Sequence, residues 1–433
     1  MSLLVINGML TRESSKGEQP ASQGASRIGT MPATASEASV TTTYPSGHKL
    51  RLLVAIASFG DKNLNWLKSI IRTYQTMDMS VDVVVVSNAP KELGPRVKVI
   101  VGLPTNNPWS LPFAHKPIFA QDVDAYDLFI YSEDDMAVTE NNIRAFLRLT
   151  PYLKSDEIAG FIRYELKQDG EWTLPEAHGV HHWRPESVRH RGIYTIAEFT
   201  NEHAGFYILT QGQLKQAVTS GGFLRGPCRG RYGWPETAAT DPYTNCGFRK
   251  VICISSLNDF LIHHLPNRYV GQLGVRLQVF REQIEALKNI GCGHHPASTL
   301  CGVESKLRLG RWSKRYDELP LAEVLRMVPA GAKTVLSVGV GTGALEVKLM
   351  QSGMRLTALP LDSVVGDAAS RLGMEVIYGS LDECFDQLVA RRFDCVVMTN
   401  LLHLQSDPGR LLRRCCELVE ESGVLVLSGP NFS

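Results

Sequence analysis

The chain has 433 residues and a formal net charge of +1, with 44% hydrophobic and 21% charged residues. This length exceeds one typical hydrophobic core, so we expect two or three domains of ordinary globular composition, and fibrous or wholly disordered classes are excluded. The near balance of charge gives no basis for a nucleic-acid partner or an anionic membrane surface, and no apolar run reaches the roughly 18 residues of a membrane span.

The first 48 residues give little sign of a folded core. Their apolar start is interrupted by Asn7 and Gly8 and lacks a preceding basic region, which argues against a secretory signal. Residues 11–48 are rich in Ser, Thr, Ala, Gly and Pro and cannot bury enough surface to offset the entropy of ordering. We predict a disordered leader over residues 1–48. Because the nine cysteines are scattered and mostly lie in apolar runs, we also predict reduced thiols and a cytoplasmic protein.

Regular structure is predicted to begin at residue 49. The apolar stretch LLVAIASFG is typical of a buried parallel strand, and a helix over residues 64–76 and a strand over residues 81–86 follow it. Strand, helix and strand at this spacing indicate a right-handed crossover in an α/β sheet. A strand over residues 97–101, a proline-containing loop and a helical segment over residues 116–123 then lead to DLFIYSEDDM.

Three acids, Glu133, Asp134 and Asp135, end this last strand. Ligands of open α/β sheets bind at the carboxyl ends of strands. Carboxylates there suit Mn²⁺ or Mg²⁺ bridging two phosphates, because the metal neutralises the charge of a nucleotide diphosphate leaving group. The alternative is a solvated acidic turn.

The stretch PFAHKPIFAQDVDAYDLFIYSEDDM, the SFG after the first strand and the distal IHHLPNRYV together resemble a GT-A-type glycosyltransferase over about half of the chain. EDD departs from the commoner DxD spelling at Glu133. The resemblance implies that Asp135 binds the metal and that Asp134 faces the ribose or a metal-bound water. It also implies a distal histidine ligand, for which His264 is preferred over His263, and the alternative is a structural pair at a strand end.

The resemblance also implies a nucleotide site at the ends of the first two strands. Its candidates for the base, ribose and diphosphate are Ser58, Phe59, Asp61, Asn88 and Lys116, each of which has an ordinary loop residue as the alternative.

The acceptor is expected to bind two later loops. Residues 226–246 mix Gly, Pro and aromatics too irregularly for one element, and they hold two acids, Glu236 and Asp241. Either acid is a candidate general base, Glu236 first, and the alternative is that both cap turns. The second loop groups His178, His181, His182 and His190 with Trp172, Trp183 and Arg184, which we interpret as an acceptor-facing loop with sugar-stacking aromatics.

A helical connector is predicted over residues 272–309, with a helix over residues 275–290. Cys292, His294, His295 and Cys301 in this connector include zinc-ligand types, but no CxxC spacing accompanies them, which argues against a zinc site.

Residues 310–433 begin a second α/β pattern. TVLSVGVGTGALEVKL is a strand running into Gly339, Gly341 and Gly343 and then a helix, and Asp362 ends the next strand. The pattern resembles a class I S-adenosylmethionine-dependent methyltransferase, which implies that these residues hold the cofactor. Ser337 replaces the family's acid, and the sequence stops after the fifth strand, so we predict an incomplete domain with an unpaired sheet edge and weak cofactor binding.

The sequence thus predicts an α/β chain in which a GT-A-type domain over residues 49–271 precedes a truncated Rossmann-like methyltransferase domain over residues 310–433. The predicted function is metal-dependent sugar transfer from a nucleotide-diphosphate donor, by default a UDP-sugar, to a glycan or glycolipid. Two alternatives stay open: methylation of a sugar substrate with S-adenosylmethionine, and a non-catalytic scaffold in polysaccharide assembly.

Overall fold

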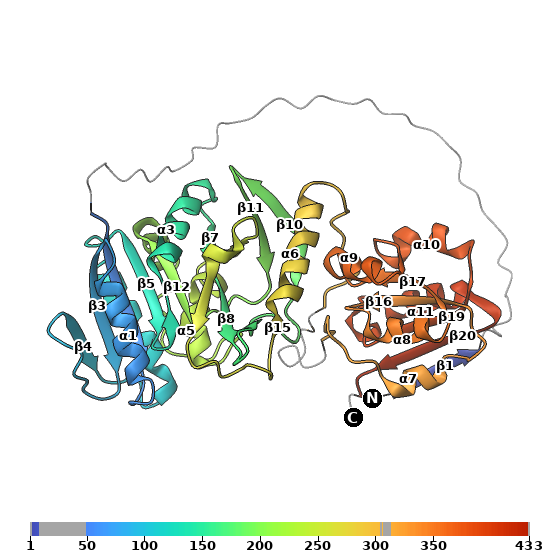
Figure 1. Cartoon of the computed structure of the whole chain (residues 1–433), viewed down its shortest axis with the longest axis horizontal. Helices are drawn as coiled ribbons and strands as arrows, with labels where there is room; N and C mark the ends of the chain where they lie inside the picture. The colour runs from blue at the N-terminus through green and yellow to red at the C-terminus, as the bar shows by residue number, and fades with distance from the viewer. Residues whose placement is uncertain (1, 8–48, 304, 306–312, 432–433) are drawn as a thin grey trace, which may run out of the picture.

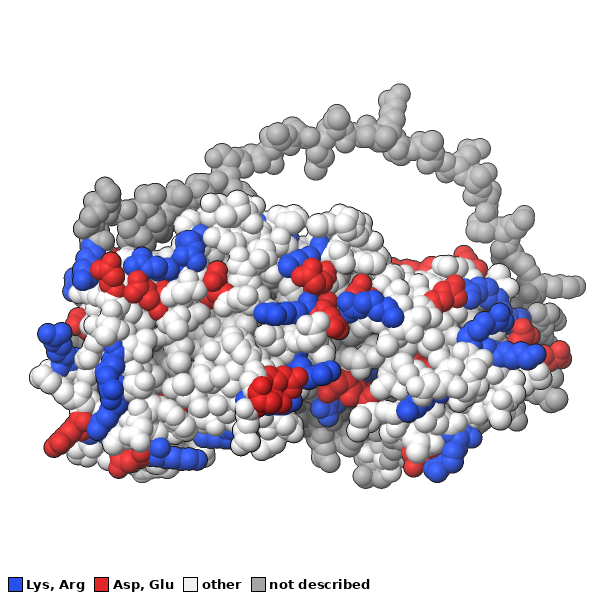
Figure 2. Space-filling view, in the orientation of Figure 1, with Lys and Arg blue, Asp and Glu red and all other residues white. Residues whose placement is uncertain are grey.

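The computed structural model describes residues 2–7, 49–303, 305 and 313–431, and it has the mixed α/β architecture that the sequence predicts. Figure 1 shows two lobes, with helices α6 and α9 facing each other where the lobes meet. Basic and acidic side chains are interspersed on the face drawn in Figure 2.

The first sheet has five strands in the order β12, β5, β2, β3, β4, all parallel except the edge strand β12. Its strands are β2 (Arg51–Ser58), β3 (Ser80–Ser87), β4 (Val97–Val101), β5 (Leu128–Glu133) and β12 (Phe206–Thr210). The helices around it are α1 (Leu64–Gln75), η1 (Pro108–Ala114), α2 (His115–Gln121), α3 (Glu140–Leu149), η2 (Thr150–Tyr152) and α4 (Gln211–Thr219). The continuous apolar runs of β2 and β5 are buried because both faces of the sheet are covered.

Two smaller sheets complete this lobe. One contains β7 (Glu157–Gly160), β10 (Trp183–Arg191), β11 (Tyr194–Phe199) and β13 (Arg249–Cys253). The other contains β6 (Met136–Ala137), β8 (Ile162–Leu166), β9 (Trp172–Leu174), β14 (Leu261–His264) and β15 (Val275–Arg276), with η3 (Leu257–Phe260) before β14. Strand β6 follows the acids of β5 directly, so this sheet begins at the predicted ligand-binding edge.

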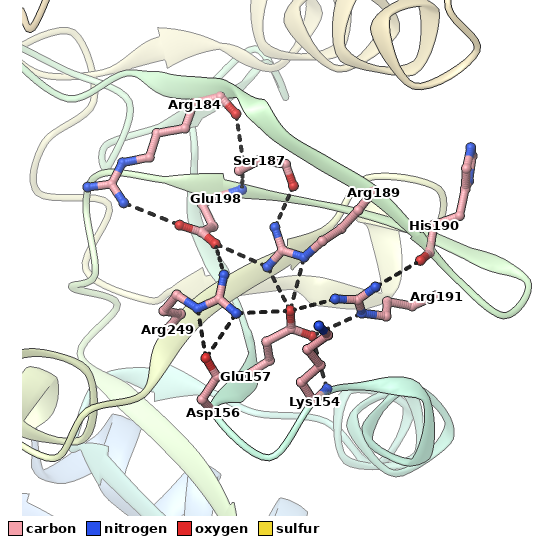
Figure 3. A network of polar contacts seen from close by, with 10 residues as sticks. All are labelled: Lys154, Asp156, Glu157, Arg184, Ser187, Arg189, His190, Arg191, Glu198 and Arg249. Carbon is pink, nitrogen blue, oxygen red and sulfur yellow. Dashed lines mark hydrogen bonds and ion pairs between the residues drawn. The ribbon is translucent and has the colours of Figure 1, made fainter. Parts of the chain in front are cut away.

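Ion pairs between a buried glutamate and three arginines link the strands of the four-stranded sheet (Figure 3). Glu157, at the start of β7, is fully buried and lies within hydrogen-bonding distance of Arg189, Arg191 and Arg249, at 3.0, 2.9 and 3.3 Å. Burial alone would raise the pKa of Glu157, but hydrogen bonds from Arg191, the amide of Lys154 and Arg189, together with the charge of Arg189, outweigh burial and lower it to about 2. The carboxylate is therefore ionised across the physiological range.

Helix α5 (Trp234–Thr244) lies within residues 226–246, where the sequence analysis predicted an irregular loop, so that prediction was wrong. Pro235 occupies the first turn, where a proline costs no hydrogen bond, and Ala238 and Ala239 are buried. Pro235, one of the prolines that suggested a loop, is therefore compatible with the start of a helix, whereas Pro242 lies inside it.

Helix α6 (Leu277–Gly291) joins the lobes. Its residues Phe280, Ile284 and Leu287 pack in one cluster with Trp183 and with Val364 of α9. The predicted connector helix is thus part of a hydrophobic core.

The C-terminal sheet has six strands in the order β1, β20, β19, β16, β17, β18. Its elements are β1 (Ser2–Asn7), β16 (Thr334–Val340), β17 (Arg355–Pro360), β18 (Glu375–Val376), β19 (Phe393–Thr399), β20 (Val419–Gly429), α7 (Ala322–Met327), α8 (Ala344–Gln351), α9 (Ser363–Arg371), α10 (Leu381–Val389), η5 (Leu402–Leu404) and α11 (Pro408–Leu418). Five strands are parallel, and β1 is antiparallel to β20.

Strand β1 corrects two predictions. Ser2–Asn7 is a strand and not part of a disordered leader, whereas residues 8–48 of that leader lie outside the described residues. It pairs with Val424–Gly429 of β20 along its whole length, so the predicted unpaired edge is covered from the other end of the chain (Figure 1).

Candidate functional site

The acids after β5 face a histidine that comes from far along the chain. Strand β6 pairs antiparallel with β14, which sets His264 opposite Met136 and beside Asp135. Nε2 of His264 lies 3.5 Å from Oδ2 of Asp135, and its Nδ1 lies 2.5 Å from Oε1 of Glu165 on β8. All three side chains are buried, so the contacts fix the imidazole between two carboxylates.

The electrostatics of this group follow from burial and close carboxylates. Burial would lower the pKa of His264, but hydrogen bonding to Asp135 and Glu165 raises it overall. Burial, reinforced by the charge of Asp135, raises the pKa of Glu133 to about 8, although Arg163 opposes the shift. Burial also raises the pKa of Asp134.

Asn63, in the loop after β2, bridges the two aspartates. Its Nδ2 donates to Oδ1 of Asp134 at 2.7 Å and to Oδ2 of Asp135 at 3.3 Å. The loop of the first strand and the acids of β5 therefore meet at one edge of the sheet, as the carboxyl ends of parallel strands must.

The donor set partly fits the predicted Mn²⁺ or Mg²⁺. Within the described ranges, no three His, Cys, Asp or Glu side chains form a ready-made metal-binding group. Asp135 and His264 nevertheless offer an oxygen and a nitrogen side by side, and Oδ1 of Asp135 is buried without a hydrogen-bond partner among these residues. Ions of this kind often take few protein ligands and complete their coordination with phosphates and water.

His263 lies away from the acids. Its ring stacks on Tyr164 at 4.9 Å, and its Nε2 is 3.0 Å from Oδ1 of Asn267. Successive side chains of a strand point to opposite faces, so only one of the two histidines can face Asp135.

The predicted nucleotide residues converge after β2 and β3. Oδ1 of Asn88 accepts a hydrogen bond from the amide of Gly60 at 2.7 Å, and Asp61 forms an ion pair with Lys91 at 3.1 Å. Ser58 is buried, whereas the ring of Phe59 is 53% exposed and free to stack on a flat ligand. The side chains of Asn88 and Asp61 hold the loop together.

Lys116 and Asp241 have a different place from the one predicted. Both are 1% exposed and they form an ion pair with each other, with the Lys116 ammonium 4.5 Å from the centre of the Phe113 ring. Burial lowers the pKa of Lys116 although the charge of Asp241 opposes this. The structure thus corrects both assignments: Lys116 is not placed to contact a diphosphate, nor Asp241 to accept a proton from an acceptor.

Glu236, in the first turn of α5, is half-buried, and its charge contributes to the raised pKa of Glu133, so it lies near the acidic group.

The residues of the predicted histidine-rich loop lie in different environments. Trp183 is fully buried with its Nε1 on Gln283, Trp172 stacks on Tyr164, and His190 is exposed. These tryptophans therefore do not form an exposed aromatic surface on which a sugar could stack.

His178 and His181 line a cavity of about 690 Å³ where the lobes meet, together with Phe199, Gln283, Tyr316 and Arg371. Burial lowers the pKa of His181 to about 3, so this imidazole in the cavity wall is neutral at physiological pH. In the connector, His295 lies 3.6 Å from Asp367 of α9 and thus contacts the C-terminal lobe.

The glycine loop after β16 lines a larger cavity of about 890 Å³. Gly339, Gly341 and Gly343 form one wall, Glu346 and Asn400 contribute side chains, and Gln272 reaches it from the N-terminal lobe. Gly339 and Gly343 have φ of 83° and 81°, a conformation that favours glycine. A Cβ on Gly341 would lie 2.2 Å from the carbonyl oxygen of Tyr316, so this glycine also admits a neighbouring segment.

Asp362 does not line this cavity, contrary to the prediction that it binds ribose. It is the N-cap of α9: Oδ1 accepts from the amides of Val364 and Val365 at 2.9 and 3.2 Å, and Oδ2 accepts from the hydroxyl of Tyr316. Burial raises its pKa to about 6 despite these donors. Its lone pairs are directed at the helix and not at a ligand.

Three residues of these sites were not predicted from the sequence: Asn63, Glu165 and Glu346. Glu165 alternates with Arg163 in an otherwise apolar strand, a sign of a charged inward face, and Glu346 is an acid in the first turn after the glycine loop. No local signal distinguished Asn63 from other loop residues.

Comparisons with known proteins cover the C-terminal lobe best. Residues 318–433 match the family model described as methionine biosynthesis protein MetW. The ubiquinone biosynthesis O-methyltransferase of Xanthomonas axonopodis pv. citri (strain 306) is 32% identical over 113 residues, which are 24% of this chain and 46% of that protein. The chain therefore spans about half the length of the curated relative it matches, and its C-terminal region is methyltransferase-like.

Two solved structures are similar at low levels. A SAM-dependent methyltransferase from Geobacter sulfurreducens, in complex with S-adenosyl-L-homocysteine, is 14% identical with a TM-score of 0.20, covering 24% of this chain and 44% of that one. A glycosyltransferase involved in the glycosylation of the major capsid of PBCV-1 is 10% identical with a TM-score of 0.25, covering 49% and 92%. The family model and the curated relative, both of which match the C-terminal lobe, favour the methyltransferase alternative over the glycosyltransferase prediction.

No helix in the described parts of the chain combines the length and the apolar character needed to cross a membrane.

Proposed function

We propose that this chain is a transferase whose residues 310–433 bind S-adenosylmethionine and transfer its methyl group to an oxygen of an acceptor. The observation that carries the proposal is the cavity of about 890 Å³ beneath the glycine loop of β16. It lies in the region that is similar to MetW and to an O-methyltransferase. We also propose the division of the chain into residues 49–271, 272–309 and 310–433, which is supported by the separate sheets of the first and last parts, with strand β1 joining the last of these parts.

The residues around the cavity suit this ligand. Gly339 and Gly343 bring backbone close to it, and α8 begins directly after Gly343 with its amides directed toward the loop. Asn400, at the end of β19, has a φ of 50° and donates a hydrogen bond to Glu318 at 3.3 Å, which fixes its side chain at the rim. The cofactor supplies an electrophilic methyl group, and the chain supplies binding and orientation.

The two reasons given above for expecting weak cofactor binding no longer apply. The sheet edge beyond β20 is paired with β1, and a buried carboxylate, Glu346, lies beside Ser337. We therefore expect S-adenosylhomocysteine to bind with micromolar or lower Kd in isothermal titration calorimetry. Absence of saturable binding at millimolar ligand would reject the proposal.

A second candidate function, glycosyl transfer by residues 49–271, is favoured by one observation: Glu165 orients His264 toward Asp135 beside Asp134. A chain of carboxylate, histidine and metal is a common arrangement around bound cations. In this proposal Asp135 and His264 hold Mn²⁺, Asp134 and Phe59 face a UDP-sugar, and Glu236 is the base toward a glycan or glycolipid hydroxyl. A hydroxyl that the transferred sugar already carries would also be a fitting methyl acceptor.

A thermal-shift screen distinguishes methyl transfer, glycosyl transfer and a non-catalytic role, since a ligand that binds only the folded state raises Tm. Stabilisation by S-adenosylhomocysteine supports the first function, and stabilisation by UDP only with Mn²⁺ supports the second. Stabilisation by neither favours the non-catalytic scaffold.

A further inference from the structure

Ser337 and Glu346 form a buried pair beside the large cavity, which Glu346 lines. Ser337 is the middle residue of β16 and donates a hydrogen bond from Oγ to Oε1 of Glu346 at 2.6 Å. Glu346 is in the first turn of α8, only 6% exposed, and it lines the cavity with the three glycines. The pair therefore directs a carboxylate, and not the serine, at the cavity.

The carboxylate of Glu346 lacks a positive partner. Among the described residues it forms no ion pair, and Oε2 receives no hydrogen bond. The lysine and the arginine of the cavity lining are engaged elsewhere: Lys314 pairs with Glu318 at 2.8 Å and Arg315 with Asp317 at 3.5 Å. The N-terminus of α8 compensates only part of a full negative charge. A buried carboxylate is costly unless it is paired, so Glu346 is suited to receive a cationic group.

We infer that Glu346 binds the ammonium group at the amino-acid end of the ligand. It thereby takes the role of the acid that Ser337 replaces. The inference rests on the proposed function, since it presumes a ligand that joins adenosine to an α-amino acid. Ser337 is a positioning residue: its hydroxyl holds Oε1, which leaves Oε2 for the ammonium.

The first test compares two ligands with and without the amino-acid end. S-adenosylhomocysteine carries the ammonium, and 5′-methylthioadenosine shares the thioether and adenosine but lacks it. In the full chain, Glu346→Gln should weaken S-adenosylhomocysteine about ten- to hundredfold by calorimetry, the usual range for a hydrogen bond to a charged group. The affinity of the Glu346→Gln variant for 5′-methylthioadenosine should be unchanged. This binding would also show that the variant is folded.

The outcomes separate the inference from the function beneath it. If neither ligand binds the unchanged chain, the proposed function is wrong. If S-adenosylhomocysteine binds the unchanged chain and Glu346→Gln equally well, the function stands and the inference is overturned. Equal losses for both ligands would also overturn it, because the glutamate would then support the cavity and not the ammonium.

A charge relocation gives a second, independent test. Ser337→Asp alone would place two carboxylates within hydrogen-bonding distance, where both cannot stay ionised, and should weaken S-adenosylhomocysteine binding. Combining Ser337→Asp with Glu346→Gln restores a single carboxylate and should recover most of the affinity. Tighter binding by Ser337→Asp alone would mean that the acid is simply missing, and it would contradict a role for Glu346.

Discussion

Glu165 on β8 holds His264 on β14 through a 2.5 Å contact between Oε1 and Nδ1, and this contact turns Nε2 toward Asp135. The two strands are parallel neighbours, so the orientation comes from a sheet and not from a loop. A carboxylate behind an imidazole fixes its tautomer and makes the far nitrogen a better donor to a cation. The relationship therefore has consequences for metal binding that can be measured.

Asp135→Ala should abolish metal-dependent nucleotide binding and leave the fold intact. The acid follows a strand end, and Oδ1 already lacks a partner among the described residues, so its removal breaks few native contacts. Loss of an outer partner alone costs a metal site about 10–100-fold in affinity, so loss of the ligand should cost more than about 100-fold. Calorimetry with UDP and Mn²⁺ measures this. Unchanged affinity would remove glycosyl transfer from consideration.

His264→Ala and His263→Ala form a matched pair. Only His264 approaches Asp135, whereas His263 stacks on Tyr164, so Mn²⁺ affinity should fall in the first variant and stay the same in the second. Titration of Mn²⁺ into each variant, followed by electron paramagnetic resonance, provides the comparison. Equal behaviour of the two variants would mean that both histidines are structural.

Lys116→Met and Asp241→Leu should each destabilise the chain, and the double variant should recover much of the loss. Each single change leaves one charge buried without its partner, at about 3–5 kcal/mol, whereas the double change replaces a buried ion pair with apolar groups. Denaturant unfolding of the four proteins gives the coupling energy. Additive losses would argue that the pair does not interact.

The fold class was predictable because the strands β2, β3 and β5 are long apolar runs whose character does not depend on their partners. The position of the acidic group at the edge of the sheet was predictable for the same reason, since Asp134 and Asp135 end such a run. The ion pair of Lys116 and Asp241 was not, because it joins positions 125 residues apart. Asp362 was misassigned because a strand-end acid can cap the next helix as readily as it can face a ligand. The pairing of β1 with β20 joins opposite ends of the sequence, and no local pattern encodes it.

Removing residues 2–7 should destabilise the C-terminal lobe selectively. Those six residues pair with β20 along its C-terminal half, so their loss exposes a strand edge that is prone to self-association. Hydrogen exchange should show faster exchange in β20 and little change in β2 and β3, and light scattering should show increased aggregation. Unaltered exchange in β20 would contradict the pairing.

Asp362→Asn should remove a pH dependence of stability between about pH 4 and pH 6. The carboxyl has an ordinary pKa of 3.8, and burial raises it to about 6 in the folded chain, so the folded state binds the proton more tightly. Its contribution to stability is fully present below the unfolded pKa and is lost as pH rises through the folded value. The difference between these two pKa values corresponds to at most about 3 kcal/mol.

An asparagine at position 362 still accepts hydrogen bonds from the amides of Val364 and Val365, so it caps the helix but does not titrate. The free energy of unfolding, measured from pH 4 to pH 7, should therefore fall more steeply in the unchanged chain than in the variant. Tyr316→Phe is the matched control: it removes the hydroxyl that favours the ionised carboxylate, so it should shift the loss of stability toward higher pH. Parallel pH profiles for all three proteins would mean that Asp362 titrates as an ordinary carboxylate.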